Sequence, residues 1–132
     1  MAIGLDTSVV LRLLTGEPRS QVAMARRRIE RAIITGETVV VTDLVVAETF
    51  YALRHHYRVP ETVARDRLRE FLDSGVAHVD PVGAAEALVP LAQGRAGLVD
   101  HLIVTRHRAL GAITATFDRQ QTRLEGAVLL GS

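Results

Sequence analysis

The fold is decided by the stretch Thr38-Val39-Val40-Val41-Thr42-Asp43-Leu44-Val45-Val46-Ala47-Glu48. Its first five residues form a β-branched run, which is typical of a buried strand. Asp43 can cap a helix that we predict from Leu44 to about His56. A short strand that leads directly into a helix is half of a βαβ unit, so the neighbouring segments decide whether the chain repeats it.

The same alternation extends along the chain on both sides of this stretch. We predict strands at residues 2–5, 76–79 and 112–116, an edge strand at 128–130, and helices at 8–14, 20–35, 60–74, 81–93 and 98–110, with Gly36 ending the second helix. Strands that alternate with helices and are apolar on both faces indicate a parallel sheet. We therefore expect an α/β fold.

Length and composition fit one domain over residues 1–132, and 48% hydrophobic residues supply a core. The absence of cysteine excludes disulfides, zinc fingers and thiol catalysis. The start of the chain lacks the basic region of a signal peptide, and no stretch approaches the roughly 20 apolar residues of a membrane helix. We therefore expect a cytoplasmic protein with no membrane segment.

Acidic residues follow the predicted strands. Asp6 ends the first strand, Glu48 lies in the first turns of the helix after the second strand, and Asp118 follows the fourth strand. The carboxyl ends of parallel strands meet at one edge of a sheet, where α/β proteins bind ligands. Asp100 opens the helix before the fourth strand, and it joins the other acids if that helix begins beside the same edge.

Two of these acids, Glu48 and Asp100, share helix faces with apolar residues. Acids are rarely buried without a partner, and an unpaired buried carboxylate is costly. A divalent cation solves this problem, because hard cations take oxygen ligands. Asp6 has an alternative role as a helix cap, and Asp118 has one as a turn residue.

A cluster of carboxylates that holds Mg²⁺ or Mn²⁺ is suited to phosphodiester hydrolysis. The metal lowers the pKa of a bound water, orients the phosphate and stabilises charge on the leaving oxygen. Such a site needs no His, Cys or Lys side chain.

Each acid lies in a short motif. The motifs are Leu5-Asp6-Thr7-Ser8-Val9-Val10-Leu11-Arg12-Leu13-Leu14-Thr15-Gly16-Glu17-Pro18, Val45-Val46-Ala47-Glu48, Leu98-Val99-Asp100-His101-Leu102-Ile103 and Thr116-Phe117-Asp118. In order and spacing they resemble the PIN domains, and within them the VapC-like toxins of bacterial toxin–antitoxin pairs. The resemblance extends over essentially the whole chain.

The resemblance implies a three-layer α/β/α fold with a central parallel sheet of four or five strands. It implies that Asp6, Glu48, Asp100 and Asp118 bind Mg²⁺ or Mn²⁺ and that an activated water cleaves RNA endonucleolytically. Thr116, and also Thr7 or Ser8, would support the acids by hydrogen bonding. Toxins of this family usually form homodimers, and a small antitoxin neutralises them by covering the groove.

The chain departs from the family pattern at its histidines. His101 stands where the family more often has a small residue, and we interpret it as a partly exposed helix residue. We interpret His55 and His56 as surface or groove residues rather than metal ligands, because adjacent helical residues point in different directions.

Basic residues are needed near the acids to bind RNA phosphates. The chain has 16 Arg residues and no Lys. A bias in the coding sequence is the simplest explanation. Arg95 and Arg119 are nearest to the acids by sequence, whereas Arg26–Arg28 and Arg31 fit a solvated helix face. Apolar side chains between residues 50 and 71 are interpreted as core, with a dimer or antitoxin groove as the alternative.

Three other functions are considered. A receiver domain or aspartyl phosphatase also places Asp after the first strand, but these proteins typically need a Lys near the phosphate, and this chain has none. A non-catalytic PIN-like binding module has no evident reason to keep all of the acids. A housekeeping RNA-processing PIN nuclease would carry the same acids, so the acids alone leave it open.

Overall fold

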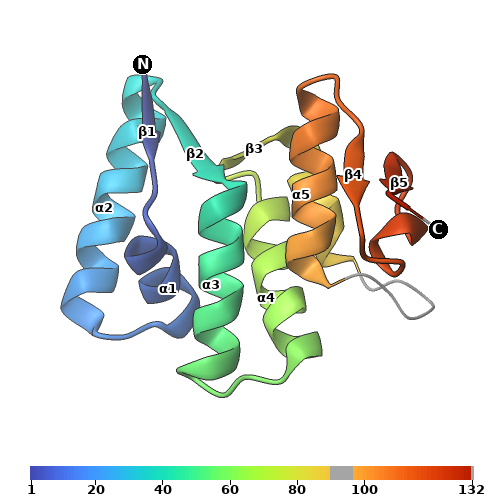
Figure 1. Cartoon of the computed structure of the whole chain (residues 1–132). Helices are drawn as coiled ribbons and strands as arrows, with labels where there is room; N and C mark the ends of the chain where they lie inside the picture. Colours follow the sequence, from blue (N-terminus) through green and yellow to red (C-terminus); the bar gives the residue numbers. More distant parts are fainter. Residues whose placement is uncertain (90–96, 132) are drawn as a thin grey trace.

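The structure is a computed structural model that describes residues 1–89 and 97–131 (Figure 1). Its elements, in chain order, are β1 (Ala2–Gly4), α1 (Thr7–Thr15), α2 (Arg19–Thr35), β2 (Thr38–Thr42), α3 (Asp43–His55), α4 (Glu61–Asp73), β3 (His78–Asp80), the 3-10 helix η1 (Val82–Leu88), α5 (Leu98–Ala109), β4 (Thr114–Thr116), the 3-10 helix η2 (Gln121–Arg123) and β5 (Ala127–Leu129). The described helices include none that is long and apolar enough to cross a membrane.

The described strands form two parallel sheets. One has the order β1-β2-β3, and its central strand β2 buries Val39 and Val41. The other pairs β4 with β5. The α/β fold class is therefore confirmed, but the prediction of a single sheet of four or five strands is wrong. The reason is the position of β4, which lies beside α5 and pairs with β5 (Figure 1).

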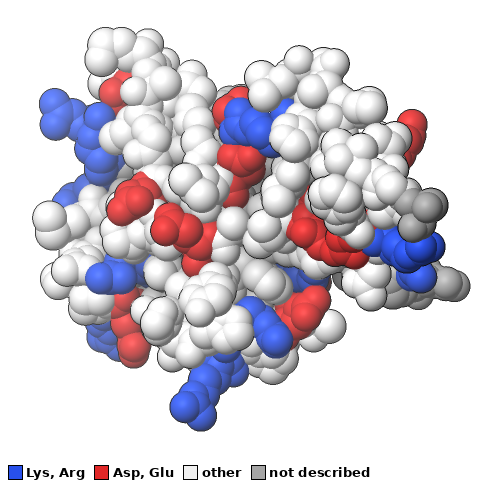
Figure 2. Space-filling view, in the orientation of Figure 1, with Lys and Arg blue, Asp and Glu red and all other residues white. Residues whose placement is uncertain are grey.

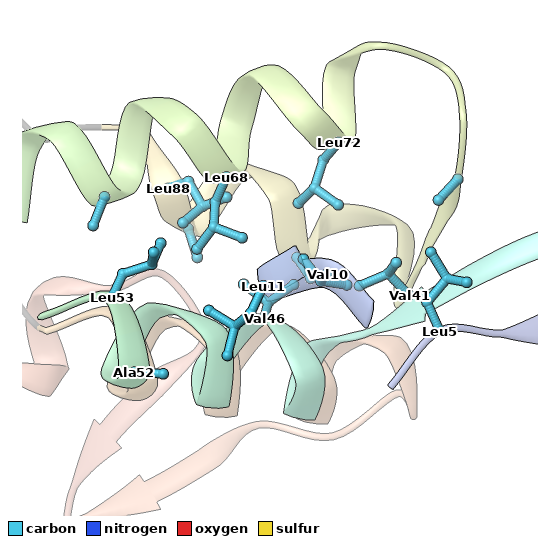
Figure 3. Packing of buried hydrophobic residues seen from close by; sticks show 14 of the residues in the cluster. Leu5, Val10, Leu11, Val41, Val46, Ala52, Leu53, Leu68, Leu72 and Leu88 are labelled. Atoms are coloured by element: carbon cyan, nitrogen blue, oxygen red, sulfur yellow. The ribbon is translucent and has the colours of Figure 1, made fainter. Parts of the chain in front are cut away.

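The hydrophobic core is centred on α3, which packs against α1, α4 and α5. Figure 3 shows Val46 and Leu53 of α3 facing Leu68 and Leu72 of α4. Val46 and Leu53 are completely buried. Among the described residues, the core reaches Leu102 of α5 and includes no residue of β4 or β5. The last two strands are therefore attached to the body of the protein mainly through α5.

The ends of α2 and α3 follow ordinary capping chemistry. Gly36 ends α2 in the left-handed conformation, with φ 78°, and its N–H donates to the carbonyls of the last turn. The predicted cap of α3 is wrong by one residue. Thr42 is the cap and accepts a hydrogen bond from the N–H of Val45, while Asp43 is the first residue of the helix. The carboxylate of Asp43 instead binds Arg106 of α5.

Two predicted elements differ from the structure. The segment predicted as a helix at 81–93 is the 3-10 helix η1 up to Leu88, and residues 90–93 lie outside the described part of the chain. The strand predicted at 76–79 is β3, which begins at His78. The boundaries of the other predicted elements agree within two residues.

The apolar side chains between residues 50 and 71 are mostly core. Leu53 and Leu68 are buried, and three others pack partly buried against the core: Phe50, Val59 and Phe71. Tyr57 and Val63 are exposed. The alternative of an interface groove made by these side chains is therefore wrong for most of them.

Candidate active site

Asp6 lies at the cap position of α1, directly after β1. Its backbone is extended, with φ −78° and ψ 164°, and its carbonyl accepts from the N–H groups of Val9 and Val10. Its side chain is exposed and makes no capping hydrogen bond. The alternative of Asp6 as a helix cap is therefore confirmed for its position, whereas its carboxylate takes no part in the cap and is available for a ligand.

Glu48 of α3 is connected to the neighbour of Asp6. The hydroxyl of Thr7 donates to Oε1 of Glu48 at 2.9 Å. This hydrogen bond links the first turn of α1 to α3, so it brings the segments that carry Asp6 and Glu48 together. The second carboxylate oxygen of Glu48, Oε2, remains for another partner.

Glu48 is exposed, so the expectation that it lies on a buried helix face is wrong. The buried face of α3 consists of Val46, Thr49, Ala52 and Leu53. Glu48 lies on the other face with Leu44 and Tyr51, which are 69% and 59% exposed. Two of the three apolar neighbours that suggested burial, Leu44 and Tyr51, are thus on the surface, whereas the third, Ala52, is buried.

Gln121 links the segment that carries Asp118 to the start of α5, where Asp100 lies. Asp100 lies partly buried in the first turn of α5, and its carbonyl accepts from Nε2 of Gln121 at 3.3 Å. Gln121 is only 7% exposed and begins η2, just after Asp118. Sequence reasoning missed Gln121, because nothing in the sequence marks it as a buried residue.

Asp118 also has a role in its own turn. Its Oδ1 accepts from the N–H of Gln120 at 2.9 Å, and its N–H donates to the hydroxyl of Thr116 at 2.9 Å. The alternative role of Asp118 as a turn residue is therefore present in the structure. Thr116, which we expected to support the acids, fixes the backbone of Asp118 rather than its carboxylate.

Hydrogen bonds link the segments that carry the acids two by two, Asp6 with Glu48 through Thr7 and Asp100 with Asp118 through Gln121. Figure 2 shows acidic side chains over α1 and α3 and a second group over the lower part of α5. Within residues 1–89 and 97–131, no group of three His, Asp or Glu side chains is placed to hold a metal ion. Asp6 and Asp118 follow strands of different sheets, β1 and β4. The meeting of all four acids in one pocket stays a prediction.

The donor chemistry nevertheless fits a hard divalent cation. Mg²⁺ is usually bound by one or two carboxylates, together with waters and substrate phosphate oxygens, rather than by a complete cage of protein ligands. Asp6, Glu48, Asp100 and Asp118 all supply carboxylate oxygens of this kind. The residues present therefore suit Mg²⁺ or Mn²⁺ as oxygen donors.

The histidines lie where the sequence indicated. His55 and His56 are exposed, and the ring of His55 lies 4.3 Å from that of Tyr51. His101 is partly buried, and burial lowers its pKa, as do the nearby charges of Arg108 and Arg65.

The basic residues expected near the acids are only partly described. Arg95 lies outside the described residues, and Arg119 is exposed next to Asp118. Ser8, the other candidate supporting residue, is exposed in the first turn of α1 and has no hydrogen bond to a described acid.

Comparison with known proteins identifies the family. No curated protein and no solved structure matches the chain. The family model of the PIN domain matches residues 3–127, which include the strand-end acids Asp6 and Asp118 as well as Glu48 and Asp100. The chain therefore belongs to the PIN domain family, whose fold is typically that of a nuclease.

Proposed function

We propose that this protein is a metal-dependent endoribonuclease that uses Asp6, Glu48, Asp100 and Asp118 to hydrolyse RNA phosphodiester bonds. The observation that supports the proposal most is the hydrogen bond from Thr7 to Glu48. It fixes one carboxylate beside the segment of Asp6, whose own carboxylate is not used in capping α1. One or two carboxylates are what Mg²⁺ usually takes from a protein, with waters and phosphate oxygens as its other ligands.

The roles of the residues follow from their positions. Asp6 and Glu48 would hold the metal, Asp100 and Asp118 would complete the site, and Thr7 would orient Glu48. Bound Mg²⁺ or Mn²⁺ supplies a water of lowered pKa and neutralises charge on the phosphate. The carboxylates then accept hydrogen bonds from the attacking water and keep it in line with the scissile bond.

We further propose that the protein is the toxin of a toxin–antitoxin pair. Support comes from the opening motif, Leu5 to Pro18, which resembles that of the VapC-like toxins. On this proposal the protein acts in the cytoplasm as a homodimer, and a small antitoxin covers the site. Expression of the chain without a partner should then arrest bacterial growth, and expression of Asp6→Asn should not.

The nuclease proposal is tested with purified protein and total RNA. We expect cleavage with Mg²⁺ or Mn²⁺ and none with EDTA. The RNA-cleavage activity of Asp6→Asn and of Glu48→Gln should each fall by more than about 100-fold. Removal of a residue that only supports a metal ligand typically costs less, about 10–100-fold. Titration with Mn²⁺ gives a second readout, because both variants should bind the ion more weakly.

Asp66→Asn is the matched control, since Asp66 is an exposed acid on α4. It should cleave RNA and bind Mn²⁺ like the wild type. Metal-dependent cleavage that survives both Asp6→Asn and Glu48→Gln would contradict the mechanism. A wild-type protein that neither cleaves RNA nor binds Mn²⁺ would instead support a non-catalytic binding module.

A further inference from the structure

A groove runs along the seam between α1 and α2, away from Asp6. Its first part is a hollow of about 510 Å³, which begins at Ser8 in the first turn of α1. Its second part is a hollow of about 730 Å³ at the turn between the two helices. Arg12 lines both hollows, so the two lie next to each other at this residue. The two hollows, called the groove below, thus extend from Ser8, two residues after Asp6, to the turn that follows α1.

Arg12 is held in position in the middle of this groove. Its Nε donates to Oε1 of Gln21 at 2.6 Å, across the seam from α1 to α2. Within residues 1–89 and 97–131, no other hydrogen bond uses the guanidinium, so its two terminal nitrogens are left for another acceptor. Two parallel N–H groups of a guanidinium match the oxygens of a phosphate.

Arg12 differs from the arginines that serve the fold. Arg28, Arg65, Arg69 and Arg106 each have an acidic partner. Arg12 is partly buried, and in the part of the chain that the structure describes it has no ion pair. A ligand anion could therefore pair with Arg12 without displacing a carboxylate of the described residues.

The far end of the groove carries further features of a nucleic-acid site. Arg19 adds a second exposed cation, and Tyr57, which is 48% exposed, offers an aromatic face. Single-stranded nucleic acids bind to grooves that combine positive charge with aromatic rings on which bases stack. One acid, Glu17, also lines this hollow and limits its net charge.

We propose that the groove between α1 and α2 binds the RNA strand on one side of the scissile bond. Arg12 and Arg19 contact its phosphates, and Tyr57 stacks on a base. This inference rests on the proposed nuclease function, because it takes the acids as the site of cleavage. On this proposal Arg12 attracts the negatively charged RNA, which the carboxylates would repel.

The test measures binding of a fluorescein-labelled single-stranded RNA of random sequence, in EDTA, over a series of salt concentrations. Arg12→Gln and Arg19→Gln should each bind roughly tenfold more weakly, the size of one lost charge-assisted hydrogen bond. The slope of log affinity against log salt should become shallower by about 0.7 for each lost phosphate contact. Arg12→Lys should regain part of the affinity, because it keeps the charge but loses the fork.

Arg26→Gln and Arg27→Gln are the matched controls, since both residues are exposed on α2 outside the groove. They remove the same charge and should leave the slope unchanged. The proposal is overturned if the Arg12 and Arg19 variants behave like these controls, or if the wild type does not bind the RNA at low salt. A groove that takes a protein segment instead would give the first of these results.

The RNA-binding test of the groove and the cleavage test of the proposed function can fail independently. Metal-dependent cleavage that requires Asp6, together with unchanged binding in the Arg12 and Arg19 variants, refutes only the groove. Groove-dependent RNA binding without any cleavage supports the groove and refutes the nuclease. Because Arg19 is exposed, Arg19→Gln keeps the test valid if Arg12→Gln unfolds the protein.

Discussion

The two pairs of candidate acids are held in different ways. In the Asp6–Glu48 pair, a hydroxyl from Thr7 touches the carboxylate of Glu48 itself. In the Asp100–Asp118 pair, the connection from Gln121 reaches a backbone carbonyl, and the carboxylate of Asp118 is occupied by its own turn. In the first pair a hydrogen bond therefore orients a carboxylate, whereas in the second pair the hydrogen bond fixes only the backbone.

The two pairs also differ in what supports them. The Asp6–Glu48 pair follows β1 and β2, which belong to the three-stranded sheet and its core. The Asp100–Asp118 pair depends on α5 and on the two-stranded sheet, which adds nothing to the core among the described residues. The geometry of a site is more reproducible where its supporting residues are packed. We infer that the first pair is the rigid half of the site.

Removing the hydroxyl of Thr7 is the strongest test of this difference. Thr7→Val keeps the shape of the side chain but leaves Glu48 without its donor. Loss of a group that orients a metal ligand typically costs about 10–100-fold in activity or metal affinity. We expect a loss of this size in RNA cleavage and in Mn²⁺ binding, measured side by side.

Thr7→Ser is the conservative control, because it restores the hydroxyl, and it should recover most of the activity. A Thr7→Val protein with full activity would show that the hydrogen bond orients nothing. In that case the contrast between the two pairs would lose its physical basis.

The sequence predicted the local structure well because local structure depends on neighbouring residues. The β-branched run Thr38–Thr42 and the glycine stop at Gly36 lie where they were expected. The sheet order depends on pairing between distant segments, which periodicity does not encode. For this reason the position of β4 beside β5, and not in the larger sheet, could not be read from the sequence.

The sequence predicted which types of residue form the candidate site better than it predicted their burial and contacts. The burial argument for Glu48 failed because α3 has apolar residues on both faces, so its pattern does not say which face is buried. Leu44 and Tyr51 are exposed, although they are apolar. The contacts that position the acids, from Thr7 and Gln121, join segments far apart in the chain.

The ion pair between Asp43 and Arg106 connects the two regions and gives the second test. Arg106 donates to both carboxylate oxygens of Asp43, at 2.7 and 3.0 Å, and so joins α5 to α3. We expect Asp43→Asn to lower Tm by a few degrees at neutral pH. Amide exchange should accelerate more in α5, β4 and β5 than in α1 and β2, because the second region depends on this contact.

The effect of Asp43→Asn should depend on pH. The hydrogen bond from Arg106, aided by its charge, holds the pKa of Asp43 below its ordinary value, although partial burial opposes this. The stabilisation is therefore complete above the ordinary pKa of Asp and is lost as the pH falls through the lowered pKa in the folded protein. The Tm difference between wild type and variant should shrink in acid. A difference that is constant down to strongly acidic pH would contradict this assignment.

Two buried threonines, one in each region, give the smallest and most local test. Thr49 of α3 is completely buried, and within the described residues its hydroxyl has no partner, whereas the hydroxyl of Thr114 in β4 is 2.8 Å from Nδ1 of His107. Because an unsatisfied buried hydroxyl is unfavourable, Thr49→Val should raise the free energy of unfolding by about 1 kcal/mol, and Thr114→Val should lower it by about the same amount. Urea denaturation measures both, with an unchanged m-value as the sign that only stability has moved. A loss of stability in Thr49→Val would mean that the hydroxyl is bonded in solution, and the packed region would then depend on polar contacts as much as the region around β4.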